Sequence, residues 1–237
     1  MSHSVAILLF SRTAGEEALH KPFSDRGEDV NRRIAGHLIS HAERTARRTG
    51  LPVVHVSSAR QRGETFGERL ADAFRQVFAQ GYARVLAIGN DCPYLTPALL
   101  REAADRLQTQ PVVLGPARDG GAYLIGLSAG SFREAAFCKL AWQTPAFYAS
   151  LRTYCHAHGL AYAELPPHQD LDNHRDVGRF LRAHHRSEPL RRLAGHLYNL
   201  LTGRDIPPPG AALTSTNRFT GTSLSRRGPP LLAASPA

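Results

Sequence analysis

The chain has 237 residues, and its 29 lysines and arginines against 20 aspartates and glutamates give a formal net charge of +9 at pH 7. Residues 178–237 hold nine arginines and two acidic residues, so residues 1–177 carry only +2. A nearly neutral body argues against nucleic acid as a partner, and a hydrophobic content of 42% argues against a disordered chain. No apolar run is long enough to span a membrane, so we expect a protein of the cytoplasm.

Strands and helices alternate along the predicted chain. The first residues, 5–10, form a continuous apolar run typical of a buried parallel strand, and a polar loop is expected after it. Further strands are predicted at 53–56, 85–88, 112–114, 122–127 and 160–165, and helices at 29–48, 66–80, 97–108, 147–158, 172–183 and 190–201. Thr96 is the expected N-cap of the third helix, with Pro97 at its first position.

This order predicts an α/β fold, a three-layer domain with a mostly parallel sheet between helices. Strand 122–127 follows strand 112–114 without a helix between them, so the sheet is expected to be mixed there. We divide the chain into this domain at 1–185, an amphipathic basic helix at 186–202, and a flexible tail rich in proline, serine and glycine at 203–237.

The helix at 186–202 has an apolar stripe flanked by arginines. The stripe consists of Leu190, Leu193, Ala194, Leu197, Leu200 and Leu201. Docking on the protein's own core or on a second subunit is the favoured interpretation. The alternative is a peripheral position on the anionic inner face of a membrane.

A carboxylate is predicted at the edge of the sheet where ligands of such folds bind. Asp91 follows the strand 85–88, Gly89 lets the backbone turn, and Pro93 prevents the strand from continuing. Asp91 is therefore a candidate ligand for a divalent cation that also holds a diphosphate. Capping of a turn is an equally good interpretation from the spacing alone.

Two further stretches place acidic residues near strand ends. Asp119 lies at the apex of a loop followed by Gly120 and Gly121, where it could orient an acceptor hydroxyl or take its proton; a plain hairpin turn is the simpler interpretation. Asp170 and Asp172 precede a predicted helix, where the pair could present a second metal ligand; N-capping by Asp172 is the simpler interpretation and is compatible with it.

Five stretches of the chain match one pattern in order and separation. They are Gln61-x-Gly63-x-x-Phe66-Gly67-Glu68-Arg69-Leu70 (Q-x-G-x-x-L-G-E-R-M), Ile88-Gly89-Asn90-Asp91-Cys92-Pro93 (I-G-S-D-C-P), residues 114–127 (L-G-P-A-x-D-G-G-Y-Y-L-I-G-L), Trp142-Gln143-Thr144 (W-S-T) and residues 170–177 (D-x-D-T-x-x-D-L). With these motifs the chain, from residue 5 to about residue 181, resembles the small bacterial glycosyltransferase-like proteins of the GT-A superfamily. That family was long described as a domain of unknown function and is also labelled transferase 1 of radical-SAM/selenodomain or arsenosugar loci.

The resemblance implies a nucleotide-diphospho-sugar transferase fold and a glycosyltransferase that uses Mg²⁺ or Mn²⁺, a nucleotide-sugar donor and a small-molecule or lipid acceptor. It implies Asp91 and Asp172 as metal ligands, with Asp91 and Asp119 as catalytic residues. The residues assigned to substrate binding are Arg12, Lys21, Gln61, Gly67, Glu68, Arg69, Gly120, Gly121, Tyr123 and Trp142. Glu68 and Arg69 could equally be an exposed helical pair, and Trp142 a core residue.

The first loop departs from the family pattern. The family carries P-x-x-G-x-x-K-T-R-L there, a basic loop suited to phosphates. This chain has two acidic residues in the loop, Glu16 and Glu17, and keeps only Arg12, His20 and Lys21 as phosphate contacts. Two alternatives to glycosyl transfer therefore stay open: nucleotidyl transfer, and a catalytically degenerate nucleotide-binding protein.

Overall fold

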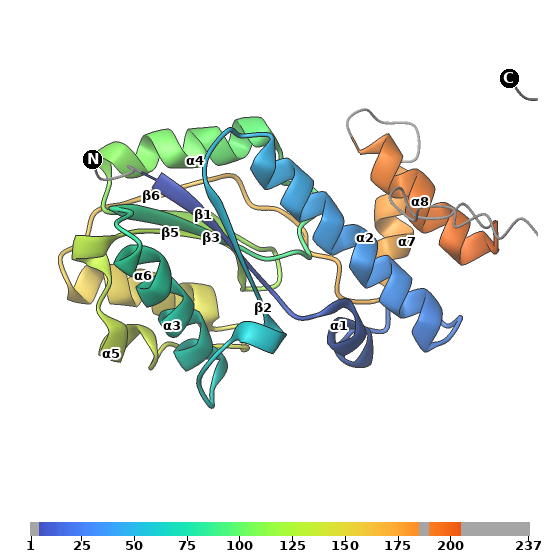
Figure 1. The fold of residues 1–237 in the computed structure, drawn as a ribbon, viewed down its shortest axis with the longest axis horizontal. Helices are drawn as coiled ribbons and strands as arrows, with labels where there is room; N and C mark the ends of the chain where they lie inside the picture. The colour runs from blue at the N-terminus through green and yellow to red at the C-terminus, as the bar shows by residue number, and fades with distance from the viewer. Residues whose placement is uncertain (1–4, 185–189, 205–237) are drawn as a thin grey trace, which may run out of the picture. The chain divides into compact units, whose positions relative to one another are not determined.

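The computed structural model describes residues 5–184 and 190–204 (Figure 1). Its strands are β1 (Val5–Ser11), β2 (Val53–Ser57), β3 (Arg84–Ile88), β4 (Val112–Pro116), β5 (Ala122–Ser128) and β6 (Tyr162–Glu164). Its helices are α1 (Ala14–His20), α2 (Glu28–Arg47), α3 (Phe66–Ala79), α4 (Pro97–Thr109), α5 (Glu134–Phe137), α6 (Phe147–Ala157), α7 (His174–His184) and α8 (Arg191–Thr202). The predicted strands and helices are confirmed to within a few residues, and α1 and α5 are additions to them.

The six strands form one mixed sheet in the order β2-β1-β3-β5-β4-β6. Strand β1 pairs in parallel with both β2 and β3, and β4 pairs in parallel with β6. Strand β5 runs antiparallel to both of its neighbours, β3 and β4. The expected reversal after the fourth strand is therefore confirmed, and it brings the β4–β5 turn to the same edge as the carboxyl ends of β1 and β3.

Helices cover both faces of the sheet, as Figure 1 shows. Strand β1 is buried along its whole length, and its side chains alternate between the two faces. Ala6, Leu8 and Phe10 face the core formed with α3 and α6. The side chains between them face α2 and α4 on the other side. A strand buried on both faces reads as a continuous apolar run, which is the pattern seen in the sequence.

A third apolar cluster lies outside the two sheet-facing cores. Leu193, Leu197 and other stripe residues of α8 pack with the first half of α2 and with α7. The stripe of α8 therefore docks on the protein's own core, which is the interpretation favoured above. Residues 186–189 and most of the predicted tail lie outside the described residues. No described helix is long and apolar enough to cross a bilayer.

Helix α1 corrects the expected polar loop after β1. Thr13 Oγ1 accepts a hydrogen bond from the Glu16 backbone N–H at 3.4 Å, and Glu16 Oε2 accepts one from the Thr13 N–H at 3.3 Å. This is the reciprocal capping box of a Thr-x-x-Glu sequence. The two acidic residues that distinguish the loop are therefore part of a helix.

Replacing Thr13 with alanine is expected to lower the free energy of unfolding by about 1 kcal/mol, because the cap of α1 is lost. Urea titration measures the change. Thr153→Ala is the matched control: this threonine is exposed inside α6, its hydroxyl binds only the Ala149 carbonyl, and alanine suits a helix interior. Equal losses for both variants would show that the cap of α1 contributes nothing.

Candidate active site

A cavity of about 530 Å³ opens at the carboxyl ends of β1 and β3. Its walls come from these strand ends, from α1 and α3, from the start of β5, from the segment between α5 and α6, and from the segment before α7. Of the candidate residues it is lined by Arg12, Lys21, Gln61, Arg69, Asp91, Asp119, Gly121, Tyr123, Trp142 and Asp172. The fold therefore gathers residues that are up to 160 positions apart in the chain.

One end of the cavity holds a compact group of charges around Lys21. Its Nζ lies 2.7 Å from Asp91 Oδ2, 2.8 Å from Asp172 Oδ1 and 3.1 Å from Glu17 Oε1. Arg12 Nη1 lies 3.2 Å from the second oxygen of Glu17. Lys21 was expected to contact phosphate, whereas the structure places its ammonium between three carboxylates.

The pKa values in this group follow from burial and from the mutual charges. Burial by itself would lower the pKa of Lys21, but the charges of Asp91, Glu17 and Asp172 outweigh it and raise this pKa above its ordinary value. Burial would raise the pKa of Asp91, and the charge of Lys21 more than compensates, so this pKa is lowered. Asp91 is therefore ionised and Lys21 protonated at neutral pH.

Asp170 is a buried carboxyl beside this group that the candidate set omitted. Burial, with the charges of Asp91 and Asp172, raises its pKa from 3.8 to about 9. Asp170 Oδ1 and Asn90 Nδ2 are both buried, line the cavity, and have no hydrogen-bond partner within the described chain. Buried polar atoms are seldom left unpaired, so both are available to a polar group or to water in the cavity.

Replacing Asp170 with asparagine is expected to flatten the pH dependence of stability. The folded-state pKa of Asp170 is raised, so unfolding releases a proton between pH 3.8 and about 9, and the stability of the native protein falls as the pH rises through this window. The asparagine side chain of the variant does not titrate in either the folded or the unfolded state. Urea titrations at about pH 6 and pH 8.5 should therefore show a smaller loss of stability for Asp170→Asn than for the wild type. Equal losses would contradict a neutral Asp170.

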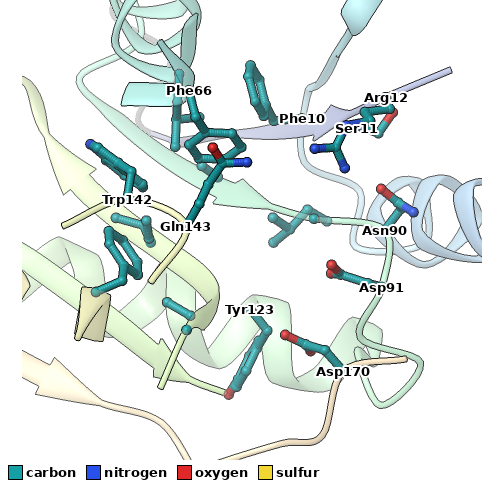
Figure 2. A pocket seen from close by; sticks show the side chains of 18 of the residues that line it. Phe10, Ser11, Arg12, Phe66, Asn90, Asp91, Tyr123, Trp142, Gln143 and Asp170 are labelled. Carbon is teal, nitrogen blue, oxygen red and sulfur yellow. The ribbon is translucent and has the colours of Figure 1, made fainter. Parts of the chain in front are cut away.

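Aromatic side chains form the other end of the cavity, as Figure 2 shows. The Trp142 ring stacks on Phe147 with centroids 4.3 Å apart and lies 5.3 Å from Phe66. Its Nε1–H donates to the Phe137 carbonyl at 2.9 Å, which fixes the orientation of the indole. Trp142 thus both packs against the core and lines the cavity, so the two interpretations of this residue are compatible.

Gln143 also lines this end of the cavity, and Figure 2 draws its side chain on the same side of the view as Trp142 and Phe66. Its φ of 59° is the only positive value at a non-glycine residue within the described chain. Gln143 occupies the serine position of the W-S-T motif. The motif alone does not reveal that this side chain faces a cavity.

The Asp119 loop is a tight turn between β4 and β5. Asp119 Oδ1 accepts a hydrogen bond from the Gly121 N–H at 2.9 Å, and both residues line the cavity. Gly120 does not line the cavity, and a Cβ at Gly120 would lie 2.1 Å from the carbonyl oxygen of Pro145, which does. The hairpin interpretation is confirmed, and it leaves the carboxylate of Asp119 at the cavity wall.

Several candidate residues have structural contacts that the sequence did not reveal. Gln61 Nε2 donates to the Ser11 carbonyl at 2.8 Å, so its amide braces the end of β1. Glu68 completes a capping box with Thr65 at the start of α3 and does not line the cavity. Gly67 also lies behind the wall, since a Cβ there would be 2.5 Å from Trp142 Nε1. Their roles in substrate binding stay predictions.

The helix expected to begin at Asp172 begins two residues later. Asn173 Oδ1 accepts hydrogen bonds from the N–H groups of Arg175 and Asp176, at 2.9 and 3.2 Å, and is thus the N-cap of α7. Capping by Asp172 is therefore wrong. Its side chain, which is 39% exposed, points instead to Lys21.

The carboxylate oxygens of Asp91 and Asp172 are the hard donors that Mg²⁺ and Mn²⁺ prefer. The position between them, however, is taken by the ammonium of Lys21. No group of three or more His, Cys, Asp or Glu side chains in residues 5–184 and 190–204 is arranged to hold a metal ion. The residues as arranged therefore do not fit a divalent cation together with Lys21.

The mixed sheet and its helical layers have the fold of nucleotide-diphospho-sugar transferases. Residues 26–144, half of the chain, match the family described as "Uncharacterized protein conserved in bacteria (DUF2064)". The chain belongs to this family.

One solved structure supports the assignment of the fold. The chain is 25% identical to a proposed nucleotide-diphospho-sugar transferase from Desulfovibrio desulfuricans, with a TM-score of 0.76 over 87% of this chain and 100% of that one. A manganese complex of Rv0371c from Mycobacterium tuberculosis is 17% identical, with a TM-score of 0.47 over 77% of this chain and 100% of that one. A cytidylyltransferase from Leptospira borgpetersenii is 14% identical, with a TM-score of 0.43 over 86% and 99%. A comparison with curated proteins gives no match.

Proposed function

We propose that the chain transfers a sugar from a nucleotide-diphospho-sugar donor to a small-molecule or lipid acceptor. The observation that carries this proposal is one cavity with two unlike ends, a charged end at Lys21, Asp91 and Asp172 and an aromatic end at Phe66 and Trp142. A nucleotide sugar has the same two parts, a charged diphosphate and rings whose flat faces suit aromatic side chains. The similarity to the Desulfovibrio protein supports it.

Each part of the cavity has a proposed role. Arg12 supplies positive charge for the diphosphate, whose negative charge grows as the bond to the sugar breaks. Lys21 offsets the negative charges of Asp91 and Asp172 beside it. The unpaired Asn90 Nδ2 donates a hydrogen bond to a phosphate or sugar oxygen. Trp142 packs against a ring of the donor. Asp119, fixed by its own turn, orients the acceptor hydroxyl and takes its proton.

The dependence on Mg²⁺ or Mn²⁺ expected from the family resemblance stays a prediction. In the protein alone the position between Asp91 and Asp172 is held by an ammonium, so a metal ion used in the reaction would have to arrive with the donor.

A panel of donors tests the proposed reaction. The protein is incubated with nucleotide sugars and with nucleoside triphosphates plus sugar phosphates, each with Mg²⁺, with Mn²⁺ and with EDTA. Release of a nucleoside diphosphate supports glycosyl transfer. Release of pyrophosphate would replace it with nucleotidyl transfer. Binding of a nucleotide without release of either product would indicate a degenerate site.

A further inference from the structure

Carboxylates enclose the ammonium of Lys21 on three sides. An ammonium group has three N–H donors, and three carboxylates surround this one at 2.7, 2.8 and 3.1 Å. The side chain of Lys21 is 14% exposed. A surface lysine would sample many positions, whereas this one is held at a single point by charges on three sides.

Residues before and after Lys21 in the chain both fix its position. Its backbone N–H donates to the Glu17 carbonyl at 2.9 Å as it ends α1, so Glu17 and Lys21 lie on the same side of that helix. Phe23, two residues further on, is fully buried in the third apolar cluster. The position of the ammonium is therefore part of the fold.

Asp91 and Asp172 come from different parts of the chain, one from the end of β3 and one from the segment before α7. Two carboxylates that share one partner repel each other unless a cation lies between them. Lys21 supplies that cation from within the chain, through contacts to an oxygen of each.

We propose that Lys21 is the resident cation of this site and prevents divalent metal ions from binding between Asp91 and Asp172. A metal ion there needs the same two oxygens and would have to displace a side chain that is buried and anchored on both sides. The inference concerns the binding of cations to the protein alone, so it holds or fails independently of glycosyl transfer.

Binding of Mn²⁺, followed by the electron paramagnetic resonance of the free ion, tests this proposal on the full chain without substrate. Lys21→Gln is nearly isosteric but has no charge, and it should bind Mn²⁺ roughly tenfold to a hundredfold more tightly than the wild type. Adding Asp91→Asn to it should abolish the gain. Lys21→Arg keeps the charge and should show no gain. Lys139→Gln removes the other lysine of the chain, which is exposed, and is the matched control.

Two results would overturn the proposal. One is wild-type binding of Mn²⁺ that is as tight as in Lys21→Gln and is lost in Asp91→Asn. The other is a folded Lys21→Gln, judged by circular dichroism, with unchanged affinity. If Lys21→Gln does not fold, the wild type and Asp91→Asn still decide: the proposal requires both to bind Mn²⁺ equally weakly, and a difference between them refutes it.

Discussion

Replacing Asp91 with asparagine is expected to lower the turnover of a nucleotide-sugar donor about a hundredfold to a thousandfold, the range seen when one group that stabilises developing charge is lost. Asp91 makes the shortest contact to Lys21, at 2.7 Å. Asparagine keeps the size of the side chain but removes its charge. The ammonium then keeps ionic partners only in Glu17 and Asp172, so its position at the charged end of the cavity is weakened.

Initial rates at saturating and at low donor concentration separate the effect on kcat from that on KM. Asp105→Asn is the matched control, because this aspartate is exposed on α4 and outside the cavity. Its rates should equal those of the wild type. Unchanged turnover of Asp91→Asn would remove this residue from the catalytic machinery and would leave the aromatic end of the cavity as the principal binding determinant.

Replacing Gly120 with alanine is expected to destabilise the protein by about 3 kcal/mol or more, since two costs combine. The φ of Gly120 is +93°, where a Cβ is strained, and this Cβ would lie 2.1 Å from the Pro145 carbonyl oxygen. The Gly120 carbonyl also accepts a hydrogen bond from the Tyr148 N–H at 2.9 Å, so neither backbone can easily move away.

Gly81→Ala isolates the first cost. Gly81 has nearly the same φ, +92°, and no atom within 4 Å of the position of its Cβ. The free energy of unfolding of Gly81→Ala should fall by only about 1–2 kcal/mol. Urea titration measures both variants. If Gly120→Ala were no less stable than Gly81→Ala, the contact with Pro145 would contribute nothing to the loss of stability. A displaced Pro145 would also move the cavity wall, so donor binding should weaken in Gly120→Ala alone.

Much of the fold was predictable because long apolar patterns determine it. The continuous apolar run forms the buried strand β1. The apolar residues at helical spacing form the buried faces of α2 and α3. Helix α1 was not predicted because it has only seven residues, too few for a periodic pattern. Its one clear signal was local, the Thr13–Glu16 capping box, and a search for such boxes before short segments would have found it.

The site was predictable where a strand end alone determines a residue's place. Asp91 and Asp119 lie at the expected edge for this reason. The partners of Lys21 were not predictable, since they depend on the end of α1 placing this residue between two distant segments. Nor does the sequence show which acid of the 170–176 stretch becomes neutral: burial and the charges of Asp91 and Asp172 raise the pKa of Asp170.

The third apolar cluster has a consequence for how the protein loses activity on heating. Phe23 and Leu171, which follow Lys21 and Asp170 in the chain, are both fully buried in this cluster with α8. The cluster lies outside the sheet, so local melting of its helices costs less than melting of the sheet itself. Inactivation is therefore expected at a lower temperature than the loss of β-sheet circular dichroism, because the charged end of the cavity is supported by the outermost layer of the fold.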